Sequence, residues 1–223
     1  MKHWGNQLRQ IAGVFGLLLL AATPQLAGAQ LVQDRDFRII NTPLAVEGKG
    51  KIEVTEFFWY GCSHCFDFEP VLGPWVKKLP ADVVFRRVPT IFPNNKWAPG
   101  AKLYYTLEAM GLTEQLHAKA FSAIHQERLR LDDDFVLLDW VAKQGVDKAK
   151  FKEVYLSFAV NARVQQAREL TASSGINGVP AVIVQGSYQA LSRGNYEDLL
   201  KVIDQLISRA RSESGASSTA GKK

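Results

Sequence analysis

Apolar residues change their spacing several times along the chain, and each change marks a predicted element. Residues 52–60 are mostly β-branched or aromatic, which is typical of a strand buried on both faces of a sheet. Residues 63–79 then place apolar side chains at helical spacing, and residues 83–88 predict a second strand. The first part of the sequence therefore predicts a strand, a helix and a strand in succession.

Helical spacing returns at residue 97 and continues to about residue 174. It is interrupted at Gly111, near residues 131–134 and at Gly145, so four or five helices fit in this stretch. The second interruption holds three consecutive aspartates, whose carboxylates can cap a helix and favour its dipole. We interpret these acids as a helix cap and not as a metal cluster.

Strand character returns near the end of the chain. Residues 179–184 and 188–191 flank the turn residues Gly186-Ser187 and predict a hairpin, and residues 195–211 have the spacing of a final helix. Ser, Gly, Ala and Lys dominate residues 212–223, which predicts a disordered tail. This order of elements predicts an α/β sheet domain that is interrupted by a helical insertion.

The N-terminal residues have the features of a cleaved export signal. Lys2 and Arg9 form a positive segment before an uncharged apolar run at residues 11–22, and Ala27-Gly28-Ala29 has the small-x-small pattern of a signal-peptidase site. The apolar run is shorter than the roughly 20 residues that span a bilayer, so we favour a signal peptide at residues 1–29 over a membrane anchor. We expect the mature chain to begin near Gln30 in an exported, oxidising compartment, without membrane insertion.

The amino-acid composition excludes some classes of protein. The chain has 47% hydrophobic residues and only two cysteines, so its core must hold without a set of disulfides. The formal charge of +5 falls by two, to +3, when Lys2 and Arg9 leave with the signal peptide, and no block of Lys and Arg predicts nucleic-acid binding. No heptad or exposed repeat predicts self-association, so we expect a monomer.

Both cysteines lie in one tetrapeptide, Cys62-Ser63-His64-Cys65, where the first strand gives way to a helix. A disulfide across two intervening residues constrains the unfolded chain little, so it is better suited to opening and closing than to stapling the fold. At a helix N-terminus the unpaired backbone N–H groups and the positive dipole favour an anion at Cys62. The thiolate is the reactive form of cysteine, so this tetrapeptide is the candidate site.

Three features occur together in this chain. They are the run Glu56–Cys65, which reads EFFWYGCSHC, then Pro70, and Gly178-Val179-Pro180-Ala181 far downstream. With them the chain resembles the DsbA family of thioredoxin-fold disulfide oxidoreductases. The resemblance implies a thioredoxin-like fold with an inserted helical domain. Its parts are a first thioredoxin-like segment at 30–95, the insertion at 96–174 and a second thioredoxin-like segment at 175–211.

The resemblance also implies roles for the residues of the tetrapeptide. Cys62 is the exposed sulfur that a client thiolate attacks, and Cys65 is the buried partner that resolves the mixed disulfide. His64 and the helix amides stabilise the Cys62 thiolate, which makes the disulfide strongly oxidising. The alternatives for His64 are a metal ligand or a surface residue. Ser63 stands where the family usually has proline, and this departure bears on the redox potential more than on the reaction.

Two further site residues follow from the resemblance. Pro180 matches a proline with a cis peptide bond that faces the disulfide and leaves the backbone of Val179 free to pair with a client; a trans turn proline is the alternative. Glu56 matches a buried acid beneath the disulfide that can relay protons. A buried carboxylate needs a partner, and of Arg86 and Arg87 we favour Arg87 by position; an edge position open to solvent is the alternative.

The resulting hypothesis is a periplasmic thiol:disulfide oxidoreductase. It donates the Cys62–Cys65 disulfide to reduced, unfolded exported proteins, which bind an apolar groove near Pro180. The resemblance implies reoxidation by a DsbB-like, quinone-linked membrane oxidase. No bound cofactor is expected, because the sulfur atoms carry the electrons.

Two other functions use the same residues. A disulfide reductase or isomerase would have the same fold and a lower potential. A metal carrier would hold copper or zinc with Cys62, His64 and Cys65, since thiolates and imidazole suit both ions. The metal carrier leaves Pro180 and Glu56 without a role, and the histidines that could complete its ligand set, His117 and His125, fall in the helical insertion, where we expect them to be far from the tetrapeptide.

Overall fold

The computed structural model describes residues 30–93, 96–191 and 194–220. The predicted signal peptide at 1–29 lies outside the described residues, as do residues 221–223 of the predicted tail. Within the described residues, no helix combines the length and the apolar character that a membrane crossing requires.

A mixed sheet of five strands lies at the centre of the fold. Its strands are β1 (Phe37–Ile39), β2 (Ile52–Phe58), β3 (Val83–Pro89), β4 (Ala181–Val184) and β5 (Tyr188–Ala190). They are ordered β1-β5-β4-β2-β3, with β2 parallel to β3 and every other pair antiparallel. The sequence predicted all of them except β1, a three-residue strand that pairs with the distant β5 and so has no hairpin turn to reveal it, unlike the equally short β5.

Seven helices accompany the sheet in the described residues. They are α1 (Ser63–Val76), α2 (Ala98–Ala109), α3 (Thr113–His125), α4 (Asp134–Lys143), α5 (Lys148–Tyr155), α6 (Phe158–Ser174) and α7 (Tyr196–Ala220). Helices α2 to α6 lie between β3 and β4, where the sequence predicted four or five helices. Helix α7 continues through residues 212–220, which the sequence assigned to a disordered tail. Adding a residue to an existing helix is far easier than nucleating one, so even a serine-rich segment with two alanines can extend it.

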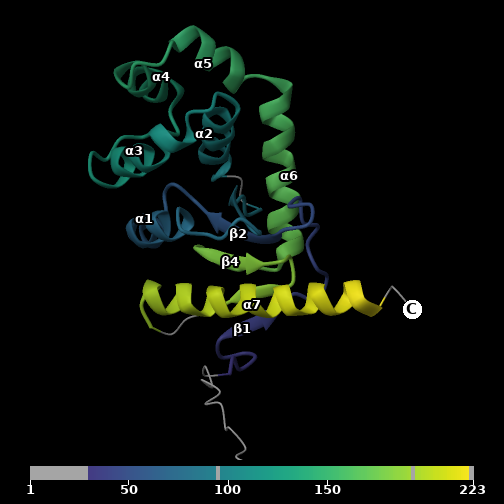
Figure 1. Ribbon diagram of the computed structural model, residues 1–223. Helices are drawn as coiled ribbons and strands as arrows, with labels where there is room; N and C mark the ends of the chain where they lie inside the picture. Colours follow the sequence, from purple (N-terminus) through teal and green to yellow (C-terminus); the bar gives the residue numbers. More distant parts are fainter. Residues whose placement is uncertain (1–29, 94–95, 192–193, 221–223) are drawn as a thin grey trace, which may run out of the picture. The chain divides into compact units, whose positions relative to one another are not determined.

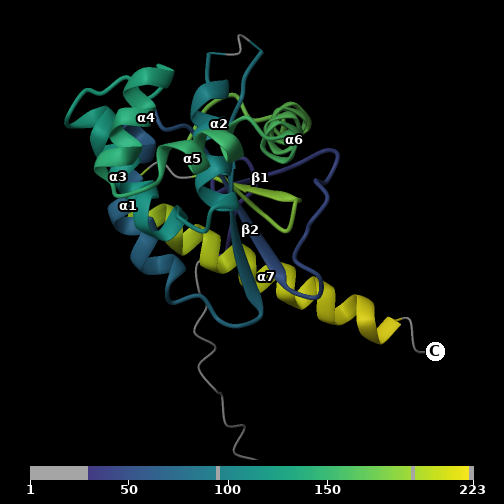
Figure 2. The ribbon, with the colours of Figure 1, turned by 90° about the horizontal axis from the view of Figure 1, so that it is seen from above.

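Side chains that alternate along the strands build a core on each face of the sheet. On β4, Val182 and Val184 pack in one core with α1 and α7, whereas Ile183 packs in the other core with residues of α2 and α6. Figure 1 shows α7 alongside the strands, with α2 to α5 grouped beyond α1. In Figure 2, β2 lies between α7 and α6. Helices α2 and α6 of the insertion therefore pack on the face opposite α7, and the candidate tetrapeptide lies at the end of β2, where α1 begins.

Strand β2 is buried along its whole length, although it carries Glu53, Thr55 and Glu56. Because successive side chains of a strand point to opposite faces, Glu53 and Glu56 face opposite sides of the sheet. Glu56 lies on the side of α1, since it shares an arginine with a residue of that helix. The buried acid of the predicted site is thus held beneath the helix that carries the cysteines.

Candidate active site

Cys62 is the N-cap residue of α1, directly after the loop that follows β2. Its sulfur accepts a hydrogen bond from the backbone N–H of Cys65 at 3.3 Å. The hydrogen bond from the Cys65 side chain, helped by the backbone N–H groups of Cys65 and His64, lowers the pKa of the Cys62 thiol to about 6, although partial burial opposes the change. At neutral pH Cys62 is therefore mostly a thiolate.

Cys65 differs from Cys62 in both exposure and acidity. Its side chain is completely buried, whereas Cys62 is only partly buried, and neither sulfur is in a disulfide in the structure. The hydrogen bond to Cys62 and the burial both raise the pKa of the Cys65 thiol far above its ordinary value. One sulfur of the pair thus loses its proton easily while the other keeps it.

His64 lies exposed between the two cysteines. Its charge lowers the pKa of the Cys62 thiol, but this contribution is smaller than those of the Cys65 side chain and the backbone N–H groups. Its carbonyl oxygen accepts a hydrogen bond from the hydroxyl of Tyr196 at 2.9 Å, which ties the start of α1 to α7. The Cys65 side chain and the backbone N–H groups at the start of α1, more than the imidazole, account for the acidity of Cys62.

The segment before β4 reaches the cysteines from a distant part of the chain. The Val179–Pro180 peptide bond is cis, so the alternative of a trans turn proline is wrong. The carbonyl oxygen of Val179 lies 3.4 Å from the sulfur of Cys62, where it can accept a hydrogen bond from the protonated thiol. Val179 and Pro180 are both only partly buried, so this backbone borders the exposed side of Cys62.

Glu56 is completely buried beneath α1, so the alternative of a solvent-open edge position is wrong. Its Oε2 accepts a hydrogen bond from Nε of Arg87 at 2.9 Å, which confirms the partner favoured from the sequence. Its Oε1 has no hydrogen-bond partner among the described residues. Burial raises the pKa of Glu56 to about 8, against the opposing charge of Arg87. Arg86 instead pairs with Glu53 and Glu47 on the other face of the sheet.

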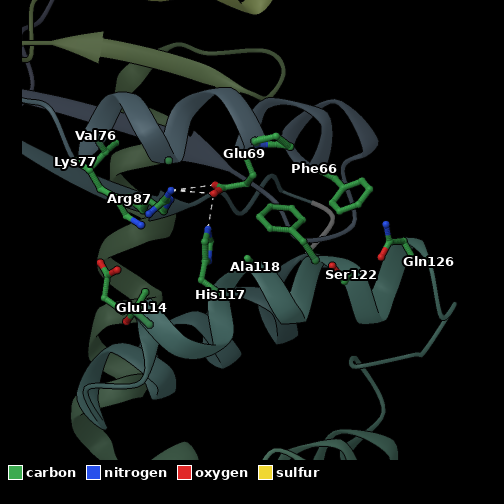
Figure 3. Close-up of a pocket in the computed structure, with 14 residues that line it drawn as sticks. Phe66, Glu69, Val76, Lys77, Arg87, Glu114, His117, Ala118, Ser122 and Gln126 are labelled. Carbon is green, nitrogen blue, oxygen red and sulfur yellow. Dashed lines mark hydrogen bonds and ion pairs between the residues drawn. The ribbon is translucent and has the colours of Figure 1, made fainter.

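A second carboxylate, Glu69 of α1, shares Arg87 with Glu56 (Figure 3). Nη2 of Arg87 donates to both oxygens of Glu69, at 3.0 and 3.1 Å. Nε2 of His117 on α3 lies 3.1 Å from Oε1 of Glu69, and Nδ1 of His117 lies 2.8 Å from the Tyr60 hydroxyl. Arg87, Glu69 and His117 line a cavity of about 450 Å³ between α1 and α3.

Sequence reasoning missed Glu69 and His117. Glu69 follows Cys65 by four residues and so lies on the same face of α1, a spacing that could have revealed it. His117 and His125 lie nearer the site than expected, since both contact Tyr60, which is two residues before Cys62. Nε2 of His125 lies 2.8 Å from the carbonyl oxygen of Tyr60. No local pattern signals these contacts, which arise because α3 packs against α1.

The metal-carrier alternative gains no support from this geometry. Across the part of the chain that the structure describes, no group of three or more His, Cys, Asp and Glu side chains is arranged to hold a metal ion. His117 and His125 are engaged with Glu69 and Tyr60 respectively. The three acids at 132–134 act at a helix start, because Asp133 is the N-cap of α4 and accepts hydrogen bonds from the backbone of the first turn.

Two neighbouring thiols with such different proton affinities, set at the end of a buried strand and facing a cis proline, define a thioredoxin-fold disulfide oxidoreductase. A sequence profile of the DSBA-like thioredoxin domain family matches residues 53–204. The chain therefore belongs to the DsbA family.

Individual relatives agree with this assignment. The thiol:disulfide interchange proteins DsbA of Pseudomonas syringae pv. tomato and Bordetella parapertussis are 41% and 42% identical over 207 and 209 residues. Each alignment covers 92% of this chain, and 94% and 97% of the respective relative. The crystal structure of Pseudomonas aeruginosa DsbA is 38% identical, with a TM-score of 0.79 over 83% of this chain and 97% of that chain. The fold class and the reaction class predicted from the sequence are confirmed.

Proposed function

We propose that the chain is a periplasmic dithiol oxidase that donates the Cys62–Cys65 disulfide to reduced, newly exported proteins. The observation that carries this proposal is the contrast between the two thiols, because the pKa of Cys62 is lowered to about 6 while that of Cys65 is raised. Reduction of the disulfide releases Cys62 as a stabilised thiolate. A stabilised reduced form makes the disulfide a strong oxidant, so donation is the favourable direction.

The reaction proceeds by two exchanges of sulfur. A client thiolate attacks the sulfur of Cys62, the Cys62–Cys65 bond breaks, and the Cys65 sulfur leaves with the electron pair and needs a proton. Protonated Glu56, beneath the same helix, supplies that proton. A second client thiolate then attacks the client sulfur of the mixed disulfide, and Cys62 leaves as a thiolate. The client gains a disulfide, and two electrons remain on the dithiol.

Client binding uses the backbone of Val179. Its carbonyl lies within hydrogen-bond distance of the Cys62 sulfur, so an extended client segment that pairs with Val179 brings its own sulfur close to Cys62. Pro180 follows on the same exposed side, and apolar client side chains of many sequences would pack beside it. Recognition of backbone and apolar surface suits an enzyme whose clients are unfolded.

Turnover requires reoxidation, for which we propose a DsbB-like, quinone-linked membrane oxidase. In that step the Cys65 thiol attacks the mixed disulfide with the partner and must give up its proton, and Glu56 can accept it only after it has lost its own proton to solvent. The export pattern of residues 1–29 supports the periplasmic location. The electrons stay on sulfur throughout, so the reaction needs no bound cofactor.

The reduction potential tests the direction of the reaction. The mature protein is equilibrated in glutathione buffers, its free thiols are trapped by alkylation, and the trapped thiols are counted by mass. We expect a potential far more oxidising than the roughly −270 mV of thioredoxin. A value near that of thioredoxin would favour the reductase or isomerase, and thiols that do not react together would contradict a redox function. Ser63→Pro shows how far the departure from the family pattern shifts the potential.

The proton relay has a separate kinetic test. Glu56→Gln keeps the shape of the protonated acid but cannot exchange a proton, so single-turnover exchange with a reduced peptide should slow by on the order of 100-fold. Stopped-flow fluorescence measures this rate, and a far-ultraviolet circular dichroism spectrum shows whether the variant is folded. An unchanged rate in a folded variant would remove Glu56 from the mechanism.

A further inference from the structure

Arg87 is placed between two carboxylates that it cannot both neutralise. Its Nε donates to Glu56 and its Nη2 donates to Glu69, so one positive charge serves two acids. If both acids ionised, the cluster would carry a net negative charge in a site where Glu56 is completely buried. Buried acids that share one cation therefore retain one proton between them at neutral pH, and they titrate as a pair.

His117 decides which of the two acids is the better place for the negative charge. Burial lowers the pKa of His117, so its imidazole is neutral. Nε2 lies 3.1 Å from Oε1 of Glu69, and an ionised carboxylate can only accept, so Nε2 carries the ring proton and donates it to Glu69. Nδ1 then accepts from the Tyr60 hydroxyl at 2.8 Å. Tyr60 thus fixes the tautomer that favours ionised Glu69.

The contacts of the two acids are unequal as a result. Glu69 accepts from Arg87 through both oxygens and from His117 through one of them, and its pKa is lowered even though burial opposes this. Glu56 accepts one hydrogen bond, and its Oε1 has no partner among the described residues. An unpartnered buried oxygen is a costly place for negative charge and a suitable place for a proton.

We propose that Glu56 and Glu69 share a single proton around Arg87, and that His117 is a positioning residue that keeps this proton on Glu56. The proposal deepens the proposed function, because it rests on Glu56 as the proton donor to Cys65. His117 belongs to α3, so the inserted helices tune the redox site through it. The cavity between α1 and α3 lets water reach Glu69 and His117 (Figure 3).

Several other charged groups surround the cluster. Glu56 is influenced by Arg87, Glu69 and the Cys62 sulfur. His117 is influenced by Glu69 and Arg87 from neighbouring elements, and by Glu114 from its own helix. Of these groups only Glu69 makes hydrogen bonds to both Arg87 and His117. The effect of His117 on Glu56 must therefore pass through Glu69.

The direct test follows the Glu56 carboxyl carbon by NMR during a pH titration of the reduced, mature protein labelled on glutamate. Glu56→Gln identifies the signal, which in the wild type should titrate near pH 8. Glu69→Gln leaves Arg87 to Glu56 alone, so the proton affinity of Glu56 should fall at least tenfold. His117→Phe makes Glu69 a better proton acceptor, so the proton affinity of Glu56 should fall in the same direction by less.

Two variants control for structural effects. Glu114→Gln removes a carboxylate from the wall of the same cavity without touching the hydrogen-bond chain, and it should leave the Glu56 titration in place. His117→Gln keeps an N–H donor for Glu69 and should restore the titration towards that of the wild type; it also carries the test if His117→Phe does not fold. A Glu56 titration that is unmoved or raised in Glu69→Gln would overturn the proposal, as would an equal shift in Glu114→Gln.

The two proposals can fail separately. If Glu56→Gln exchanges disulfides at the wild-type rate, the proposed proton relay is wrong. The NMR titration can still show that Glu56 and Glu69 share a proton. If Glu56→Gln slows exchange but Glu69→Gln leaves the Glu56 titration unchanged, the proton relay stands and only the shared-proton proposal is wrong. If both proposals hold, Glu69→Gln should shift the pH profile of the exchange rate in an otherwise wild-type protein. The same substitution should not shift that profile in a protein that already carries Glu56→Gln.

Discussion

The two faces of strand β2 surround a buried glutamate in different ways. Glu53, at the start of the strand, has nearly all of its hydrogen-bonding capacity used. Its Oε2 accepts from the backbone N–H groups of Glu47 and Gly48, at 2.7 and 3.0 Å, and its Oε1 accepts from the Thr55 hydroxyl at 2.9 Å. Nε of Arg86 adds an ion pair at 3.4 Å. This carboxylate holds a loop against the sheet.

Glu56, three residues later and on the other face, has one hydrogen bond and one oxygen without a partner among the described residues. Both acids face an arginine of β3, so the presence of a cation does not distinguish them. The difference lies in how many donors surround the oxygens. A carboxylate with several donors is kept charged and rigid, whereas one that lacks donors tends to hold a proton and can exchange it.

Removal of Glu53 should have the largest effect on stability. Glu53→Ala leaves two backbone N–H groups, a hydroxyl and Arg86 without their acceptor, so the free energy of unfolding should fall by about 3–5 kcal/mol. Urea unfolding followed by circular dichroism measures the change. Glu47→Ala is the control, because its half-exposed ion pair with Arg86 should be worth about 1 kcal/mol or less. If Glu53→Ala lowers the free energy of unfolding no more than Glu47→Ala does, Glu53 is not the structural carboxylate that the contrast with Glu56 requires.

Glu56→Gln should change stability in the opposite direction, and the change should depend on pH. The unfolded chain releases the Glu56 proton near its ordinary pKa of 4.5, whereas the folded chain keeps it until about pH 8. Between these values the folded state binds more protons, so the free energy of unfolding of the wild type falls as the pH rises and levels off above about 8.

Gln resembles the protonated acid and does not ionise, so the free energy of unfolding of Glu56→Gln should not fall in this way as the pH rises. At pH 8 it should be more stable than the wild type by on the order of 3 kcal/mol, and the difference should shrink towards pH 5. Thermal unfolding at several pH values provides the measurement. A variant that is less stable than the wild type at pH 8 would show that Glu56 is structural, as Glu53 is.

Thr55→Val tests the redundancy around Glu53 with a smaller effect. The substitution removes one of three hydrogen bonds to Glu53 and keeps the shape of the side chain, so the free energy of unfolding should fall by about 1 kcal/mol. Chemical denaturation of both proteins gives the difference. A loss as large as that of Glu53→Ala would mean that the hydroxyl, and not the set of donors, holds the carboxylate.

The smallest expected effect concerns the catalytic thiol. The pKa of Cys62 is about 6, and over that range Glu56 is still protonated and neutral, so Glu56→Gln should leave the Cys62 titration almost unchanged. The ultraviolet absorbance of the thiolate reports this titration. A clear fall in the Cys62 pKa in Glu56→Gln would indicate that Glu56 is ionised at neutral pH, contrary to the comparison with Glu53.

Some of the site could be predicted because its signals are local. The burial of β2 follows from its continuous apolar run, and the position of Cys62 at a helix start follows from the change of spacing after it. Arg87 was favoured as the partner of Glu56 on position, and the observed register pairs these two residues directly. The capping role of the acids at 132–134 was also local, since Asp133 bonds to backbone N–H groups of the next turn.

The sequence by itself determined the order of the elements, the dithiol at a helix N-terminus and the family, because each depends on residues close together or on a motif of matched residues. The tertiary structure alone decided that His117 reaches Glu69 and that Glu53 and Glu56 differ in their donors. Solvation, charge and hydrogen bonding act through space, so the proton affinity of a buried group depends on neighbours that only the packing of α1, α3 and the sheet brings together.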